Sequence, residues 1–94
     1  SMSQANLEAR ATAVVSEAGI GSVVQLDSLV GAGSAPGSTI ASFGIALTGD
    51  HREVLRHHRI PVIARTFDKV TYLDMRSVSP ADDDIVVAAL SSLR

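Results

Sequence analysis

The stretch SFGIALTGDHREVLRHHRIP, residues 42–61, decides which fold this chain can adopt. Its first part places Phe43, Ile45 and Leu47 at every second position, with smaller residues between them. Alternation with a period of two predicts a β-strand that is buried on one face. We therefore expect a strand here, with these three side chains turned toward the core.

The second part of this stretch predicts a short helix over residues 50–58. Asp50 can cap its first turn while Glu53, three residues later, completes a capping box, and Pro61 prevents continuation. A helix this short is a poor crossover between parallel strands, so we expect the strands on either side of it to run antiparallel. The residues expected to face inward are Val54 and Leu55.

The rest of the chain predicts a helix at each end and strands between. The first is a helix over 6–18, whose apolar residues share one face: Leu7, Ala11, Val14, Val15 and Ala18. A strand over 23–30 and a hairpin of 61–67 and 70–77 around Asp68-Lys69 are expected next. The last helix is opened by Ser79-Pro80, has Asp82, Asp83 and Asp84 in its first turn, and carries its apolar face on Ile85, Val86, Ala89, Leu90 and Leu93. Asp68-Lys69 lacks the glycine that a tight turn prefers, which favours a longer or bulged turn.

The order α-β-β-α-β-β-α predicts an α+β fold. We expect a two-layer sandwich in which a mainly antiparallel four-stranded sheet carries three helices on one face. Residues 3–94 are expected to form a single domain, and residues 1–2 are interpreted as a tag remnant.

Composition narrows the class of protein. The formal net charge of −2 with only 3% aromatic residues argues against a chain that binds nucleic acid on its own. There is no cysteine, and no apolar run is long enough to span a membrane. The expectation is a cytoplasmic chain without a membrane partner.

The segment VGAGSAPGSTI, residues 30–40, has the glycines of a phosphate loop but not the context. A dinucleotide-binding loop must open a helix, whereas the pattern that follows here is a strand, and the lysine of a P-loop is missing. On pattern alone, a glycine-permitted connection remains.

Arg65 lies mid-strand between apolar residues and needs an anion or a route to solvent. Two interpretations stay open: an internal pair with Asp74 across the hairpin, or bidentate contact with a ligand carboxylate or phosphate. Arg76 raises the same question. Three histidines, His51, His57 and His58, suit a solvated helix end better than a metal site, so no metal site is predicted.

Three segments together resemble the C-terminal part of the bacterial selenocysteine synthases, the L-seryl-tRNA(Sec) selenium transferases. They are VGAGSAPGSTIASFGIALTGD, PVIARTFDKVTYLDMRSVSPADDD and the short Arg/His-rich helix between them, and the resemblance extends from about Leu26 to Leu90. The family pattern has a glycine at Ala32, a leucine at Ala35, a proline at Ala41 and commonly a glycine-containing turn at Asp68-Lys69. These departures leave room for a divergent member or a relative with another substrate.

The resemblance implies the small domain of a fold-type I pyridoxal-phosphate enzyme. That enzyme converts seryl-tRNA(Sec) to selenocysteinyl-tRNA(Sec) with selenophosphate, as a homo-oligomer in the cytoplasm. Its cofactor lysine and its tRNA-binding N-terminal region lie outside this chain, which is therefore expected to hold no catalytic residue, to bind no pyridoxal phosphate covalently and to be inactive alone. Small domains of this type often supply an arginine to the substrate, which makes Arg65 the candidate for an anion contact. The resemblance also makes the glycine loop a candidate for lining the active-site mouth or a subunit interface, through Gly31, Gly33, Ser34, Pro36 and Gly37.

Two other interpretations stay open. The chain could be the same domain of a related pyridoxal-phosphate lyase or transferase acting on a small amino acid, or a non-catalytic α/β interaction module. If it is a piece of a larger fold, apolar residues that face the missing part are exposed and favour self-association. The first helix and the Ala-Pro loop are the expected locations.

Overall fold

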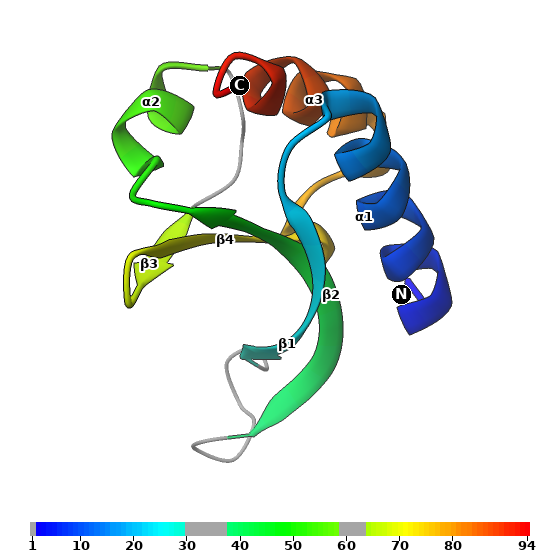
Figure 1. Cartoon of the computed structure of the whole chain (residues 1–94). Helices are drawn as coiled ribbons and strands as arrows, with labels where there is room; N and C mark the ends of the chain where they lie inside the picture. Colours follow the sequence, from blue (N-terminus) through cyan, green and yellow to red (C-terminus); the bar gives the residue numbers. More distant parts are fainter. Residues whose placement is uncertain (1, 30–37, 59–63) are drawn as a thin grey trace.

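A computed structural model describes residues 2–29, 38–58 and 64–94 (Figure 1). The elements are α1 (Gln4–Ala18), β1 (Ser22–Leu29), β2 (Thr39–Thr48), α2 (Arg52–His57), β3 (Arg65–Phe67), β4 (Val70–Asp74) and α3 (Asp83–Ser91), with 3-10 turns at Met75–Ser77 and Pro80–Asp82. The predicted order α-β-β-α-β-β-α is confirmed.

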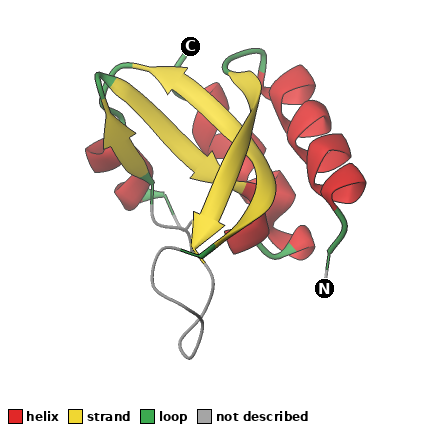
Figure 2. Ribbon diagram, turned by 90° about the horizontal axis from the view of Figure 1, so that it is seen from below, coloured by secondary structure: helices red, strands yellow, loops and turns green. Residues whose placement is uncertain are grey.

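The four strands form one sheet in the order β1-β2-β4-β3, and each neighbouring pair is antiparallel. The short α2 separates β2 from β3, and β4 then returns to pair with β2 (Figure 2). All three helices lie on one side of the sheet (Figures 1 and 2). The predicted α+β class and antiparallel four-stranded sheet are confirmed.

The core lies between the helical layer and one face of the sheet. α1 packs against β2 and α3, because its apolar residues recur every three or four positions and so share one face. The side chains that fill this space are nearly all aliphatic: Leu7, Ala11, Val14, Ala18, Ile45, Leu47, Leu55, Leu73, Met75, Val78, Val86, Ala89 and Leu90.

α1 has a defined cap at each end. The Ser3 hydroxyl accepts a hydrogen bond from the Asn6 backbone N–H at 3.2 Å, which satisfies one of the free donors of the first turn. At the other end Gly19 adopts a left-handed conformation with φ 73°, and its N–H donates to the Val15 carbonyl. Gly19 therefore ends α1.

α2 is shorter than predicted, and its cap differs. The helix begins at Arg52 after His51, whose side chain makes no capping hydrogen bond. The Asp50 carboxylate accepts from the Arg52 backbone N–H at 3.1 Å and pairs with its guanidinium, so the predicted capping box with Glu53 does not form. Leu55 is buried as expected, but Val54 is 45% exposed.

The predicted one-sided burial of β2 is only partly right. Ile45 and Leu47 are buried, whereas Phe43 is only partly buried, and Ser42 and Gly44 on the opposite face are buried as well. A Cβ at Gly44 would overlap the Leu73 carbonyl oxygen and press on the Leu26 side chain. The backbones approach so closely there that only glycine fits.

The β3–β4 hairpin closes with two residues, not with the longer or bulged turn that was expected. Phe67 pairs with Val70, and both intervening residues have positive φ: 50° at Asp68 and 62° at Lys69. Positive φ at both central positions is the geometry of a type I′ turn, which matches the twist of the strands. Strand twist therefore sets this turn although neither residue is glycine.

α3 also begins later than predicted. Pro80 opens a 3-10 turn, the α-helix starts at Asp83, and the Ser79 side chain makes no capping hydrogen bond. Ile85 is 37% exposed, whereas the other predicted inward residues of this helix are buried or partly buried.

Candidate functional site

The glycine-rich loop predicted as an active-site mouth lies outside the described residues. Its candidates Gly31, Gly33, Ser34, Pro36 and Gly37 fall within the segment 30–37 between β1 and β2. Their role stays a prediction.

Arg65, the predicted anion contact, begins β3 and is exposed. Its backbone pairs with that of Tyr72 in β4. This register places the two residues on the face of the sheet opposite the helices. Among residues 2–29, 38–58 and 64–94, no ion pair includes Arg65, so the predicted pairing with Asp74 does not form. The guanidinium is accessible to a ligand or to another protein surface.

Asp74 is instead the centre of an internal polar cluster. Its carboxylate accepts hydrogen bonds from the Ser28 hydroxyl, from the Ser42 hydroxyl at 2.5 Å and from the Arg76 backbone N–H at 3.0 Å. Both serines are buried. These bonds join β1, β2 and the end of β4, so the cluster holds strands together and leaves Asp74 little capacity for other partners.

The guanidinium of Arg76 is used within the fold. It donates to the Ala41 carbonyl at 2.7 Å and to the Met2 carbonyl at 3.3 Å. Its Nε is buried and finds no hydrogen-bond partner among the described residues. Arg76 therefore ties β2 to the start of the chain, and both of its terminal nitrogens donate within the fold.

Sequence reasoning missed the most connected ion pair. Arg10 of α1 makes two hydrogen bonds to Asp83 of α3, at 2.6 and 2.9 Å, and also donates to the carbonyls of Met75 and Val78. The Arg10 side chain is only 13% exposed. The available signal was an arginine beside the apolar stripe of α1, together with three consecutive aspartates whose position in a first helical turn already has an explanation in capping.

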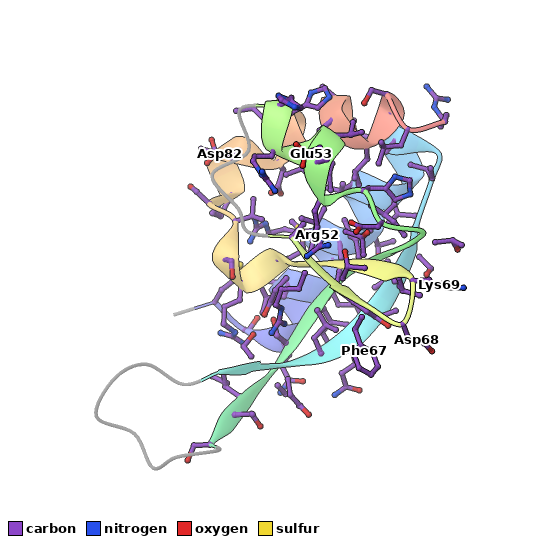
Figure 3. All side chains as sticks on the ribbon, turned by 90° about the vertical axis from the view of Figure 1, so that its left-hand side faces the viewer. Arg52, Glu53, Phe67, Asp68, Lys69 and Asp82 are labelled. Carbon is purple, nitrogen blue, oxygen red and sulfur yellow. The ribbon has the colours of Figure 1, made fainter. Side chains whose placement is uncertain are left out.

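A surface hollow of about 270 Å³ lies at the start of α2 and is lined by charged residues, two of them labelled in Figure 3. They form two ion pairs: Asp50 with Arg52 at 2.8 Å, and Glu53 with Arg56 at 3.6 Å. Hydrogen bonds from the side chain and backbone of Arg52, and from the Thr66 hydroxyl, hold the pKa of Asp50 well below its usual range. The hollow therefore presents charges that already neutralise each other.

The described histidines occupy ordinary surface positions. His51 Nε2 lies 2.7 Å from the Thr48 carbonyl oxygen, and His58 Nε2 lies 3.2 Å from the Ser92 hydroxyl. That hydroxyl donates its proton to the Ala89 carbonyl at 2.6 Å, so it accepts from His58. This is the reverse of a serine activated by a general base.

Two features are absent from the part of the chain that the structure describes. No group of three His, Asp or Glu side chains there is placed to hold a metal ion. None of the described helices is long and apolar enough to cross a membrane.

Comparison with known proteins gives a specific relationship. No protein-family model matches the chain. A curated L-seryl-tRNA(Sec) selenium transferase from Caldanaerobacter subterraneus subsp. tengcongensis is 35% identical over 77 residues, which are 76% of this chain. The protein of the same name from Clostridium perfringens strain 13 is 30% identical over 78 residues. This chain is related in sequence to a segment of the selenium transferases.

The relationship covers much of the chain but little of a selenium transferase. The match occupies 17% of the length of each of these two relatives, so the chain spans about one sixth of a selenium transferase. The resemblance predicted from three sequence segments is thereby confirmed for the chain as a segment of such an enzyme.

Proposed function

We propose that this chain is the small C-terminal domain of an L-seryl-tRNA(Sec) selenium transferase. The complete enzyme would convert seryl-tRNA(Sec) to selenocysteinyl-tRNA(Sec) with selenophosphate, as a cytoplasmic homo-oligomer that binds tRNA(Sec) through regions outside this chain. The observation that carries the proposal is 35% identity over 77 residues to a transferase of that name. The alternation of strands and helices in a compact α+β unit is consistent with a domain of a larger enzyme.

The residues described here do not fit the pyridoxal phosphate that the family implies. Lys69 is the sole lysine of the chain and lies, exposed, in the two-residue turn between β3 and β4. Arg10, Arg52 and Arg76 are engaged with a carboxylate or with backbone carbonyls. The cofactor would be bound by the remainder of the enzyme, and the isolated chain would be inactive.

Arg65 is the residue of this chain proposed to contact an anion of the substrate complex. Its guanidinium is exposed, carries no described ion pair and lies on the sheet face that the helices leave open. Because the carboxyl of the seryl group is esterified to tRNA, the suitable anion is a phosphate, which the planar guanidinium can bind with two hydrogen bonds. The loop 31–37 is proposed to line the active-site mouth or a subunit interface.

The test is turnover of seryl-tRNA(Sec) with selenophosphate by the complete polypeptide that contains this chain. Arg65→Ala is expected to lower turnover by about tenfold or more, the effect of losing one charge-assisted contact. Arg56→Ala is the matched control, because Arg56 is exposed on α2 and its ion pair is 3.6 Å long. An unchanged rate for Arg65→Ala removes that residue from the site, and a complete polypeptide unable to form selenocysteinyl-tRNA overturns the proposed function.

A further inference from the structure

One face of the sheet carries no helix. α1, α2 and α3 all lie on the other side, as Figures 1 and 2 show from two directions. In an antiparallel sheet paired residues lie side by side on the same face, so the register identifies the residues of the open face. Ala46 pairs with Tyr72, Tyr72 with Arg65, and Phe67 with Val70.

The open face is largely apolar. Phe67 is 75% exposed, the highest value among the large hydrophobic residues described as exposed. Figure 3 shows its side chain projecting from the hairpin away from the helical layer. We call the apolar residues that the register places on this face the open patch: Val24, Leu26, Ile40, Ala46, Phe67, Val70 and Tyr72. Ile40 and Phe67 are exposed, and the others are partly buried, as a sheet surface is before a second layer covers it.

The helical side presents a different surface. The exposed positions of α1 are polar residues or alanine: Gln4, Ala5, Asn6, Glu8, Ala9, Thr12, Ala13, Ser16 and Glu17. The first helix, expected from sequence to expose apolar residues, thus keeps them in the core. A contiguous apolar surface rimmed by polar residues usually marks an interaction site, and here it lies on the sheet.

The hairpin holds the open patch in a fixed position. Phe67 pairs directly with Val70 across the type I′ turn, and the turn is tied down by a hydrogen bond from the Gly49 N–H to the Lys69 carbonyl at 2.6 Å. A rigid, preformed aromatic anchor loses little entropy on binding, so it suits the centre of an interface.

We propose that the open patch docks on another domain of the same, longer polypeptide. This inference rests on the proposed function, under which about five sixths of the enzyme lies outside this chain. Domains of one polypeptide commonly bury such faces against each other. The partner surface would be apolar where it meets the open patch, and Arg65, on the edge strand β3, would remain at its rim.

Charge argues against a second copy of this chain as the occupant. The register places two charged residues on this face, Arg65 and Asp74, and Asp74 is already bonded to Ser28, Ser42 and the Arg76 backbone. A symmetric contact of the face with itself would bring two arginines together without a free carboxylate between them. A different surface that carries no arginine at this place avoids this repulsion.

Cysteine labelling tests the proposal, since the chain contains no cysteine of its own. Phe67→Cys probes the open patch, and Val54→Cys, at a 45% exposed position of α2, is the matched control. Each variant is made in the isolated chain and in the complete polypeptide and is treated with a maleimide at low protein concentration. Peptide mass spectrometry then gives the labelling rate at each position.

In the isolated chain both cysteines are expected to label at similar rates. In the complete polypeptide, labelling at position 67 is expected to slow by about tenfold or more relative to position 54, because an interface core excludes water. Equal labelling in the complete polypeptide would overturn the proposal. Protection of position 67 in the isolated chain that grows with concentration would do so as well, and would assign the patch to a second copy.

Two further measurements keep the result interpretable. Hydrogen exchange of the unmodified protein over residues 65–72, isolated and within the complete polypeptide, answers the same question if the Phe67→Cys variant does not fold. The seryl-tRNA(Sec) assay separates the two proposals: protection in an inactive polypeptide supports the interface and overturns the function, whereas activity with equal labelling does the opposite.

Discussion

At the scale of single residues, two arginine–aspartate pairs of similar geometry differ in burial. The Arg10 and Asp83 side chains are 13% and 25% exposed, whereas those of Arg52 and Asp50 are 52% and 49% exposed. Water screens the exposed pair, while the other is held between α1 and α3 together with two backbone carbonyls. Their contributions to stability should therefore be very different.

Replacing Arg10 by Ala is expected to lower the free energy of unfolding by about 2–3 kcal/mol, because Asp83 and two carbonyls lose their partner in a partly buried setting. Arg52→Ala, the control, is expected to cost less than about 1 kcal/mol, as exposed pairs do. Urea denaturation followed by circular dichroism measures both. Equal losses for the two variants would contradict this ranking.

The lowered pKa of Asp50 predicts a specific pH dependence. Its pKa in the folded chain lies below the unfolded value near 4, so the stabilisation is present above about pH 4 and is lost as the pH falls toward the folded pKa. The stability difference between the wild type and Asp50→Asn should be greatest at neutral pH and shrink on acidification. Urea titrations between pH 7 and pH 2 measure this, and parallel curves for the two proteins would contradict it.

At the scale of elements, the β3–β4 turn carries conformational strain. Lys69 has φ 62°, a left-handed conformation that costs a residue with a Cβ about 1 kcal/mol or more. Lys69→Gly is therefore expected to raise the free energy of unfolding by about 0.5–1 kcal/mol, since Asp-Gly is a preferred type I′ sequence. Thermal unfolding should show an increase of several degrees.

The control for this turn is Lys69→Val. A β-branched residue tolerates positive φ poorly, so the melting temperature should fall where glycine raises it. A rise with valine, or no change with glycine, would mean that the backbone at this position is not strained.

At the scale of the whole molecule, the strand order predicts how local stability is distributed. β2 and β4 are central, while β1 and β3 form the edges, and α2 contributes only Leu55 to the buried core. Native-state hydrogen exchange should therefore be slowest in β2 and β4 and fastest in α2 and β3. Exchange in α2 as slow as in β2 would show that the chain unfolds only as a single unit.

Much of the fold was readable from local pattern. The spacing of Leu7, Ala11, Val14 and Ala18 located α1, and a short helical pattern before Pro61 was enough to favour antiparallel pairing. Details of the caps were not readable, because the Asp50 carboxylate also accepts a hydrogen bond from the Thr66 hydroxyl, which the fold brings within 3.0 Å from sixteen positions away.

The candidate site was only partly readable. Arg65 was proposed as a candidate by its residue type within an apolar strand, and of the two interpretations left open, the pair with Asp74 does not form, because Asp74 accepts from Ser28 and Ser42. Pairing between distant serines and an aspartate leaves no periodic signal in the sequence. The Arg10–Asp83 pair, 73 positions apart, is hidden for the same reason.

The sequence by itself determined the order of elements, the apolar faces of α1 and α3 and the relationship to a segment of the selenium transferases, because periodicity and residue identity are local properties. Only the tertiary structure decided which charges are paired internally and which face of the sheet stays uncovered. Both depend on the register between strands and on which side the helices pack. A shift of one residue in that register would exchange the two faces of the sheet. Phe67 and Arg65 would then both turn toward the helices.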